Sequence, residues 1–276
     1  MREGYAVNID FWKMHGAGND FIMVDDRRVE FPAADTGWIR RLCVRNTGVG
    51  SDGLILICPS QTARFRMRFF NPDGTEGEMC GNGARCVARL AYDLGIAPRR
   101  MNMETVAGLV KAEIVDDGVR VVLTPPSEWR MHCPLEINGR SLICHCVNTG
   151  VPHAAIETDD LQMVNVHELG AAVRHHSMFA PRGTNVDFMT VTGTNTLRLR
   201  TYERGVEAET PSCGTGSVAC ALVAGRLGKV VSPVQVTCAE GDVLNVEFRL
   251  TADGAEDVTL SGPAVYVFEG RVEYRQ

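Results

Sequence analysis

The sequence carries one short motif twice, and each copy stands directly before an apolar segment long enough to form a helix. Residues 80–83 read Cys-Gly-Asn-Gly, and residues 213–216 read Cys-Gly-Thr-Gly. A Leu-Gly pair follows each copy at the same distance from its cysteine, at residues 94–95 and 227–228. Glycine just past the last helical residue is a frequent helix terminator. The repeat therefore predicts two related halves, each with a central helix that begins at a cysteine.

The position of the two cysteines predicts reactive thiols. The first backbone N–H groups of an α-helix have no acceptor within the helix, and the helix dipole places partial positive charge at the same end. Both effects favour a thiolate, so we expect a lowered pKa at Cys80 and Cys213. Two such thiols indicate paired acid–base chemistry. The N–H groups that can bind a substrate carboxylate at these helix ends belong to Gly81, Asn82, Gly214 and Thr215.

Composition and charge narrow the class of protein. The formal net charge is −6 and the chain has no long Lys/Arg cluster, which argues against a nucleic-acid partner. Ten cysteines in 276 residues are too few for a disulfide scaffold, so we expect free thiols in a reducing compartment. Residues 1–13 lack a signal-peptide pattern, and no stretch approaches the roughly 20 apolar residues of a membrane span. We therefore expect a cytoplasmic protein with no membrane partner.

The residue patterns predict many strands and few helices. Strand-like runs rich in β-branched or aromatic residues are Asn8–Lys13, Phe21–Asp25, Leu54–Cys58, Phe65–Phe70, Val119–Leu123, Val186–Val191, Thr196–Tyr202, Val234–Cys238 and Val243–Phe248. Helices are expected at Trp38–Arg45, Gly83–Leu94 and Thr215–Leu227. A chain of 276 residues is longer than one core usually serves. Pro125-Pro126-Ser127, near the midpoint, is the best candidate for a linker between two domains.

This linker divides the chain into two predicted domains. Residues 1–125 form an N-terminal domain that carries Cys80, and residues 126–266 form a C-terminal domain that carries Cys213. The final strand, at about 267–276, is expected to return to the first domain.

A second echo supports the duplication. Gly18–Phe21 resembles Gly183–Phe188, and both segments offer an Asn beside a strand. If a pseudo-twofold axis relates the halves, both helix N-termini converge on one cleft between domains, where ligand sites commonly occur.

Six sequence blocks resemble a known family in content and order. The most specific are FFNPDGTEGEMCGNGAR at Phe69–Arg85 and RTYERGVEAETPSCGTGSVAC at Arg200–Cys220. The others are Phe11–Asp25, Arg45–Ile57, Asn148–His153 and Arg182–Phe188. Together they resemble the diaminopimelate epimerases, amino-acid racemases that work without pyridoxal phosphate. The resemblance implies an α/β (α+β) fold of two pseudo-symmetric domains, each a mostly antiparallel curved sheet wrapped around a central helix, and it implies a homodimer.

The resemblance also implies a reaction without a cofactor. It predicts interconversion of LL- and meso-2,6-diaminopimelate, which serves lysine and peptidoglycan precursor synthesis. By the match of motifs, Cys80 and Cys213 are the two bases. One thiolate removes the α-proton from one face of the amino acid, while the other cysteine, as a thiol, protonates the opposite face. The configuration inverts.

The remaining predicted contacts come from the same motif match. Asn71, Asn185 and Arg204 match family positions that hold the carboxylate at the far end of the substrate, and Glu203 matches the position that pairs with its ammonium group. Asn19 matches a residue near the reacting centre. The residue types agree with these roles, because a guanidinium group suits a carboxylate and a carboxylate suits an ammonium group.

Two other functions stay open. Many family members have Gly-Asn-Pro-His where this chain has Gly-Val-Pro-His at residues 150–153, so Val151 leaves a racemase of another amino acid as an alternative. The Glu203-Arg204 pair favours a substrate with two ammonium and two carboxylate groups. A thiol–disulfide oxidoreductase is the other alternative, because two activated cysteines can oxidise to each other, although the chain has no Cys-x-x-Cys.

Neither a bound cofactor nor a metal is expected. A pyridoxal enzyme needs a Schiff-base lysine, and the three lysines, Lys13, Lys111 and Lys229, lie in no recognisable cofactor motif. His132-Cys133 and Cys144-His145-Cys146 look like zinc ligands. However, adjacent residues of a strand point to opposite faces, and the spacing matches no common zinc finger.

Overall fold

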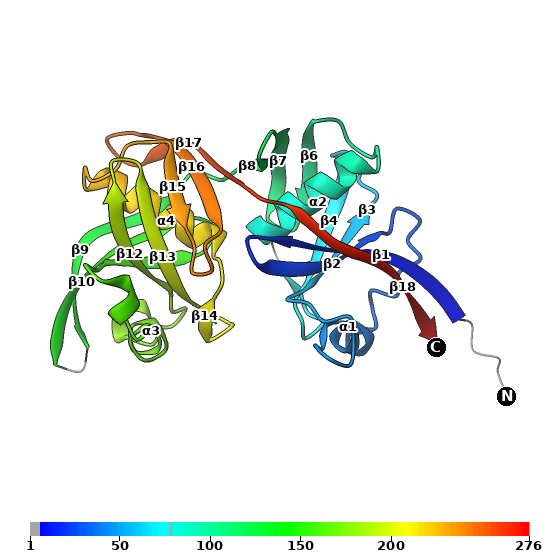
Figure 1. The fold of residues 1–276 in the computed structure, drawn as a ribbon, viewed down its shortest axis with the longest axis horizontal. Helices are drawn as coiled ribbons and strands as arrows, with labels where there is room; N and C mark the ends of the chain where they lie inside the picture. The colour runs from blue at the N-terminus through cyan, green and yellow to red at the C-terminus, as the bar shows by residue number, and fades with distance from the viewer. Residues whose placement is uncertain (1–5, 78, 138, 276) are drawn as a thin grey trace. The chain divides into compact units, whose positions relative to one another are not determined.

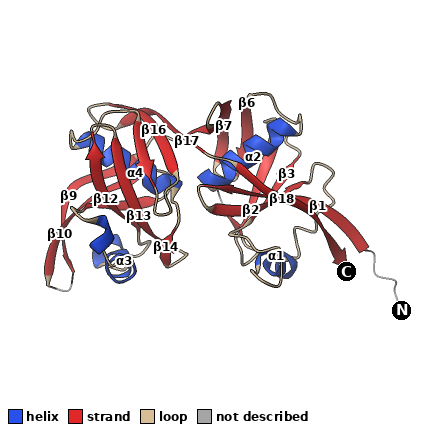
Figure 2. Ribbon diagram, viewed as in Figure 1, coloured by secondary structure: helices blue, strands red, loops and turns tan. Residues whose placement is uncertain are grey.

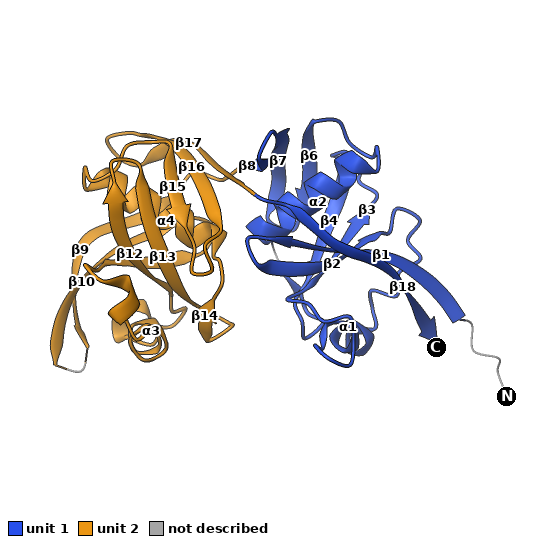
Figure 3. Ribbon diagram, viewed as in Figure 1, with its two compact units in different colours: residues 1–121, 263–276 blue, residues 122–262 orange. Residues whose placement is uncertain are grey.

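The computed structural model describes residues 6–77, 79–137 and 139–275, and strands predominate over helices in it (Figures 1 and 2). The chain divides into two compact units (Figure 3). Unit 1 comprises residues 1–121 and 263–276, and unit 2 comprises residues 122–262. The junctions at 121/122 and 262/263 each lie four residues before the boundaries drawn from the sequence, at 125/126 and 266/267.

Unit 1 is a mixed sheet with two helices. Its elements are β1 (Ala6–Gly16), β2 (Asn19–Asp25), α1 (Thr36–Cys43), β3 (Leu54–Cys58), β4 (Phe65–Phe70), β5 (Glu76–Gly77), α2 (Gly81–Asp93), β6 (Arg100–Thr105), β7 (Gly108–Val115) and β18 (Val265–Arg275), and β8 (Gly118–Val122) ends at the junction. Strand β18 pairs antiparallel with β1 from Ala6 to His15. The last strand of the described chain therefore completes the sheet that the first strand begins.

Unit 2 repeats this composition. Its elements are β9 (Ser127–Ile137), β10 (Arg140–Asn148), β11 (Pro152–Glu157), η1 (Leu161–Met163), α3 (Val166–Arg174), η2 (Ser177–Phe179), β12 (Asn185–Gly193), β13 (Thr196–Glu203), β14 (Ala208–Thr210), α4 (Gly214–Arg226), β15 (Val234–Thr237), β16 (Val243–Leu250) and β17 (Ala255–Gly262).

The two units share one pairing order. In unit 1, β1–β2 is antiparallel, β2–β3 parallel, β3–β4 antiparallel, β4–β6 parallel and β6–β7 antiparallel. In unit 2, the same alternation runs through β10–β11, β11–β12, β12–β13, β13–β15 and β15–β16. Two parallel neighbours that follow each other in the chain need a crossover connection. The crossover from β2 to β3 contains α1, and the crossover from β11 to β12 contains α3. The strand order supports the duplication predicted from the sequence motif.

The second sequence echo, between the segments of Asn19 and Asn185, is wrong as an equivalence. Asn19 begins β2, which pairs antiparallel with β1 and parallel with β3. Asn185 begins β12, which pairs parallel with β11 and antiparallel with β13. Strand β12 therefore occupies the position of β3 in the shared order. The likeness of the two short segments therefore does not mark equivalent positions.

A buried helix lies at the centre of each unit. Helix α2 contacts β1, β2, β3, β4 and β7, and α4 contacts β10 to β13 and β15 to β17. The second glycine of each Cys-Gly-x-Gly motif permits this close packing. A Cβ atom at Gly83 would lie 2.5 Å from Ile55 Cδ1, and a Cβ at Gly216 would lie 2.4 Å from Asp187 Oδ1. The first glycine of each motif starts the helix, so α2 begins two residues, and α4 one residue, before the predicted Gly83 and Thr215.

Each unit has its own apolar core around its first crossover helix. In unit 1, Trp38 of α1 packs on Phe31 and on Tyr274 of β18, with ring centroids 5.2 and 4.9 Å apart. In unit 2, Val166 and Val173 of α3 pack among buried residues of β9 to β13. Among the residues that the structure describes, no helix is long and apolar enough to cross a membrane.

The predicted α+β fold class is confirmed, but several elements were missed. The nine predicted strands correspond to observed ones, with end points that differ by a few residues. The sequence reasoning did not predict α3, the β9–β10 hairpin, β6, β7, β11 or β17. In β9 the apolar residues Trp129, Met131, Cys133, Leu135 and Ile137 alternate with polar residues and one proline, so the period-two signal of a strand was present in the sequence and was overlooked.

Candidate active site

Cys80 is the N-cap of α2, as the sequence motif predicts. Its backbone is extended, with φ −131° and ψ 122°, and its carbonyl oxygen accepts from Ala84 N at 2.7 Å as the first helical hydrogen bond. The N–H groups of Gly81 and Asn82 precede that bond, so the helix itself gives them no acceptor. Cys80 is half-buried. A partly exposed thiol thus stands beside backbone donors that can bind an anion.

A chain of hydrogen bonds connects Cys80 to charged residues of unit 1. The Cys80 thiol donates to Asn19 Oδ1 at 3.6 Å, and Asn82 Nδ2 donates to the same oxygen at 3.3 Å. On the other side, Asn19 Nδ2 donates to Asp52 Oδ2 at 2.9 Å. The structure therefore brings Asn19 and Asn82 together at the thiol, and it fixes the orientation of both amide groups.

Two arginines anchor the ends of this chain. Arg85, which is 0% exposed, donates through Nη2 to Asn82 Oδ1 at 2.9 Å and through Nε to Pro263 O at 3.3 Å. At the other end, Arg45 Nη2 donates to Asp52 Oδ1 at 2.8 Å and to Asp20 Oδ1 at 3.0 Å. The sequence reasoning assigned no role to Arg85, Asp52 or Arg45, although all three lie in the blocks that carried the family resemblance.

Asn71 does not belong to the hydrogen-bonded chain at Cys80 described above. It lies in the turn that joins β4 to β5 in unit 1. Its side-chain nitrogen donates to Thr75 Oγ1 at 3.1 Å, and its backbone N–H donates to Thr75 O at 2.8 Å. These bonds fix the turn. The proposed substrate contact of Asn71 stays a prediction.

Cys213 is the N-cap of α4, with φ −120° and ψ 108°. Its sulfur accepts from Gly216 N at 3.4 Å and lies 3.5 Å from Thr215 Oγ1. Ser217 donates to the Cys213 carbonyl oxygen through both its backbone N–H and its hydroxyl, each at 2.9 Å. Thr149 Oγ1 donates to Thr215 O at 3.0 Å. These hydrogen bonds hold the helix start that carries Gly214 and Thr215.

The expected lowering of the Cys213 pKa is not what the structure supports. Cys213 is 7% exposed. Burial raises its pKa well above the ordinary thiol value, and the negative charges of Glu203 and Asp187 raise it further. The hydrogen bonds from Thr215 and Gly216 lower it, but they do not offset burial. Helix position alone predicted a thiolate, whereas the tertiary surroundings favour the thiol.

The other predicted residues of unit 2 lie around the end of β13. Asn185 is buried, and its Oδ1 accepts from Arg204 N at 2.8 Å. The Arg204 guanidinium donates to Arg182 O at 3.3 Å. Glu203 accepts from Thr210 Oγ1 at 2.9 Å and its charge acts on Cys213. The structure thus places Glu203 near Cys213 and fixes the backbone of Arg204 through Asn185.

A buried His–Asp pair also lies in this site and was missed. His153 Nδ1 and Asp187 Oδ2 are 2.7 Å apart, and both side chains are 0% exposed. Asp187 Oδ1 accepts from Thr201 Oγ1 at 2.8 Å, and His153 Nε2 lies 3.5 Å from Asn185 Nδ2. The pair connects β11 and β12 beneath the start of α4. The only sequence signal was that His153 and Asp187 belong to the blocks Asn148–His153 and Arg182–Phe188.

Solved structures with this fold define a class of two-unit α+β proteins. A PhzF-family phenazine biosynthesis protein from Bacillus anthracis has a TM-score of 0.76 and 16% identity, and covers 96% of this chain and 99% of its own. A hydroxyproline epimerase from Agrobacterium vitis has a TM-score of 0.71 and 18% identity, with coverages of 97% and 92%. At these identities the likeness establishes the fold. Within this class, the chain has a cysteine-capped central helix in each unit.

Sequence comparison identifies the family. The family model described as diaminopimelate epimerase matches residues 11–129 and 145–267. A diaminopimelate epimerase from Aquifex aeolicus is 44% identical, covering 96% of this chain and 98% of its own length. One from Archaeoglobus fulgidus is 42% identical, covering 96% of both. The chain belongs to the diaminopimelate epimerase family, an isomerase family, as the sequence blocks predicted.

Proposed function

We propose that this protein interconverts LL- and meso-2,6-diaminopimelate, with one of Cys80 and Cys213 removing the α-proton and the other supplying a proton to the opposite face of the α-carbon. The observation that carries the proposal is the repeated site: each unit presents a cysteine as the N-cap of its buried central helix. The names of the relatives support the substrate. The reaction needs one acid and one base, and the chain supplies both from the same kind of residue.

The surroundings of the two thiols support an assignment of their roles. Burial and neighbouring carboxylates raise the pKa of Cys213, so Cys213 is the thiol that donates a proton in the resting enzyme. In this direction of the reaction Cys80, which is half-buried and stands at a helix start, first loses the proton that it donates to Asn19 Oδ1 and then removes the α-proton as a thiolate. One C–H bond breaks at the α-carbon and one forms on its opposite face. After turnover Cys80 holds the proton and Cys213 is the thiolate, which is the form that catalyses the reverse reaction.

The helix N-termini support stabilisation of the carbanion. When the α-proton leaves, negative charge spreads onto the α-carboxylate. The N–H groups of Gly81, Asn82, Gly214 and Thr215 are donors at a positive helix end, where such charge is favoured. Asn19 contributes by fixing the orientation of Asn82 through their shared hydrogen bond.

Recognition of the far end of the substrate is assigned to residues at the end of β13 and to the two asparagines. Arg204 would hold the distal carboxylate with Asn185 and Asn71, and Glu203 would pair with the distal ammonium. The Arg204 backbone is fixed by Asn185 Oδ1 at 2.8 Å. A fixed backbone and a planar guanidinium suit recognition of one carboxylate in one orientation.

Incubation in deuterium oxide tests the reaction and the substrate together. The reduced protein is given a panel of amino acids, and α-hydrogen exchange is followed by NMR. Exchange and inversion confined to LL- and meso-diaminopimelate would support the proposal. Exchange confined to another amino acid would favour the alternative that Val151 leaves open. Thiol-dependent disulfide reduction without any exchange would favour the oxidoreductase.

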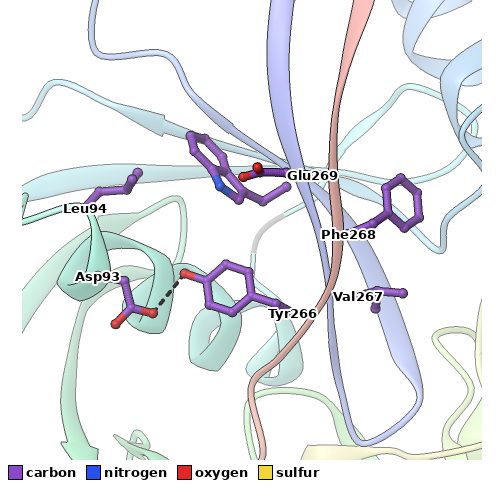
Figure 4. Close-up of a pocket in the computed structure, with 7 residues that line it drawn as sticks. Asp93, Leu94, Tyr266, Val267, Phe268 and Glu269 are labelled. Atoms are coloured by element: carbon purple, nitrogen blue, oxygen red, sulfur yellow. Dashed lines mark hydrogen bonds between the residues drawn. The ribbon is translucent and has the colours of Figure 1, made fainter.

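We further propose a cytoplasmic enzyme that forms a homodimer, with a small-molecule substrate and no nucleic-acid or membrane partner. All ten cysteines are free thiols, which suits a reducing compartment. The dimer proposal rests on an apolar patch of β18: Tyr266, Val267 and Phe268 are 39%, 55% and 47% exposed. They line a surface hollow of about 450 Å³ with Asp93 and Leu94 (Figure 4).

Sedimentation velocity tests the dimer. Val267→Glu places a charge beside Phe268, whose side chain lies on the same side of β18 as that of Val267 (Figure 4), and should give monomers. Val231→Glu changes a valine that is 70% exposed in unit 2, and it should leave the dimer intact. A monomeric native protein would contradict the assignment.

A further inference from the structure

Three cysteine sulfurs converge at the β9–β10 hairpin of unit 2, away from the residues assigned to epimerisation. The Sγ atoms of Cys133, Cys144 and Cys146 all lie within 4.8 Å of one another. The Cys144 and Cys146 sulfurs are 3.9 Å apart. Cys144 and Cys146 are 0% and 4% exposed, whereas Cys133 is half-buried. The cluster therefore has two buried sulfurs and one that solvent can reach.

The strand register explains why the sulfurs meet. Cys144 and Cys146 are two residues apart on β10, so they share one face of the sheet. Cys133 on β9 is directly opposite Cys144, and Arg130 is opposite Cys146. Two residues of β9 therefore stand against His145 alone, which defines a β-bulge. The bulge includes His132 in a left-handed conformation at φ 56°, a strained backbone state that often marks functional sites.

Adjacent residues of a strand point to opposite faces, which excludes His145 as a ligand beside Cys144 and Cys146. The same rule places Cys144 and Cys146 on one face, because they are two residues apart. The contact with Cys133 depends on the register of the hairpin, which residue spacing does not give.

The spacing of the three sulfurs fits one small metal ion. Thiolate sulfur binds Zn²⁺ at about 2.3 Å, so three sulfurs around one ion lie roughly 4 Å apart. Soft thiolate ligands select Cu(I) and Zn²⁺ among the biological metals. We propose that Cys133, Cys144 and Cys146 bind one thiophilic d¹⁰ metal ion, with Cu(I) as the three-coordinate occupant that needs no further protein ligand. Binding releases the thiol protons to solvent and involves no change of oxidation state.

A cationic residue lies beside the cluster. Arg130 is directly opposite Cys146 on the neighbouring strand, and its carbonyl oxygen lies 3.6 Å from Cys133 Sγ. The Arg130 side chain lies over the Phe179 ring, 6.0 Å from its centroid. A positive guanidinium thus compensates part of the negative charge that three thiolates bring into a low-dielectric region.

This site is independent of the proposed epimerase function. Cys133 and Cys144 lie in residues 130–144, the segment that separates the two ranges matched by the family model. The cluster ties β9 to β10 at the edge of the unit 2 core, where Cys144 and Cys146 are core residues and Cys133 packs against them. A bound ion would fasten this hairpin to the core.

Alkylation of the native protein tests the proposal. The protein is titrated with Cu(I) under anaerobic conditions, in competition with a chromogenic Cu(I) chelator, and then treated with iodoacetamide. Peptide mass spectrometry should show that one equivalent of Cu(I) protects Cys133 from alkylation. X-ray absorption should show about three sulfur neighbours per copper near the 2.3 Å typical of metal–thiolate bonds. A parallel titration with Zn²⁺ distinguishes the two ions.

Two variants locate the site. Cys133→Ser removes the half-buried ligand and should lower Cu(I) affinity by more than the roughly 10–100-fold that a second-shell change costs, while epimerase turnover stays unchanged. Cys58→Ser removes a buried cysteine of unit 1 and should keep the protection of Cys133. Equal alkylation of Cys133 with and without metal, or a Cys133–Cys144 disulfide as the only product, would overturn the proposal.

Discussion

Arg85 offers the sharpest test of how the start of α2 is held in place. Its guanidinium is 0% exposed and donates to Asn82 Oδ1 at 2.9 Å and to Pro263 O at 3.3 Å. Arg85→Met keeps much of the side-chain volume but removes both donors. A buried acceptor left without a partner costs about 1–3 kcal/mol. This cost applies to Asn82, which is buried, whereas Pro263 is half-buried and its carbonyl oxygen can bind water instead. We expect a loss of about 1–3 kcal/mol.

Arg89, one turn further along the same helix, is the matched control. It is partly exposed, and its Nε donates to Asp93 Oδ2 at 2.7 Å in an i,i+4 pair. Such pairs contribute about 0.3–0.5 kcal/mol, so Arg89→Met should lower the free energy of unfolding by no more than this. The two substitutions are chemically identical, and they differ only in what surrounds the side chain.

Urea unfolding followed by tryptophan fluorescence measures the difference. Trp12 and Trp38 belong to unit 1 and Trp129 to unit 2, so the signal reports mainly the unit that contains Arg85. The midpoint should fall clearly in Arg85→Met and hardly at all in Arg89→Met. The backbone amide hydrogens at the start of α2, next to Cys80, should also exchange faster with solvent in Arg85→Met than in the native protein. Equal losses below about 1 kcal/mol in both variants would refute the view that Arg85 anchors this helix start.

Three further outcomes are expected. Cys80→Ala and Cys213→Ala should each lower epimerisation at least about a thousandfold with unchanged circular dichroism, and near-normal turnover in either would reject its role as a base. Burial and the charge of Glu203 raise the pKa of Cys213, so alkylation of Cys213 should increase only at a pH above the range in which an ordinary thiol reacts. Glu203→Gln should shift the increase to lower pH, and an unshifted profile would contradict this. Gly216→Ala places a Cβ 2.4 Å from a buried carboxylate oxygen and should cost about 1–3 kcal/mol. A thermal melting temperature equal to that of the native protein would exclude this clash.

The local signals in the sequence were sufficient for the central helices. Cysteine and glycine at each helix start, and glycine at φ 69° and 71° after each helix end, act within one turn of the chain. These local signals therefore predict a helix between the same residues, whatever the helix packs against. Helix α3 was missed even though Asn165 caps it by accepting from Glu168 N at 3.2 Å, because an Asn three residues before a Glu is common outside helices too.

Properties set by residues far apart in the sequence could not be predicted. The Cys213 pKa depends on burial and on carboxylates from β12 and β13, and none of these can be placed without the fold. The same holds for the His153–Asp187 pair, which joins two strands across a long crossover. Whether Cys133 lies beside Cys144 and Cys146 depends on the register of the β9–β10 hairpin, which a β-bulge changes by one residue. The position of each cysteine at a helix start was predicted correctly, but the direction of the Cys213 pKa shift was not, because burial and nearby carboxylates outweigh the effect of the helix end.

The pairing of β1 with β18 constrains the order of events during synthesis. Translation delivers β1 before any other described strand, and β18 after all of them. The edge of β1 between Ala6 and His15 therefore remains unpaired with β18 while more than two hundred residues emerge from the ribosome. Unit 2 lies within that interval as a continuous segment, so it can complete its core first. An exposed strand edge is a site for misassembly, and nascent chains of this protein are most vulnerable to it until β18 is released.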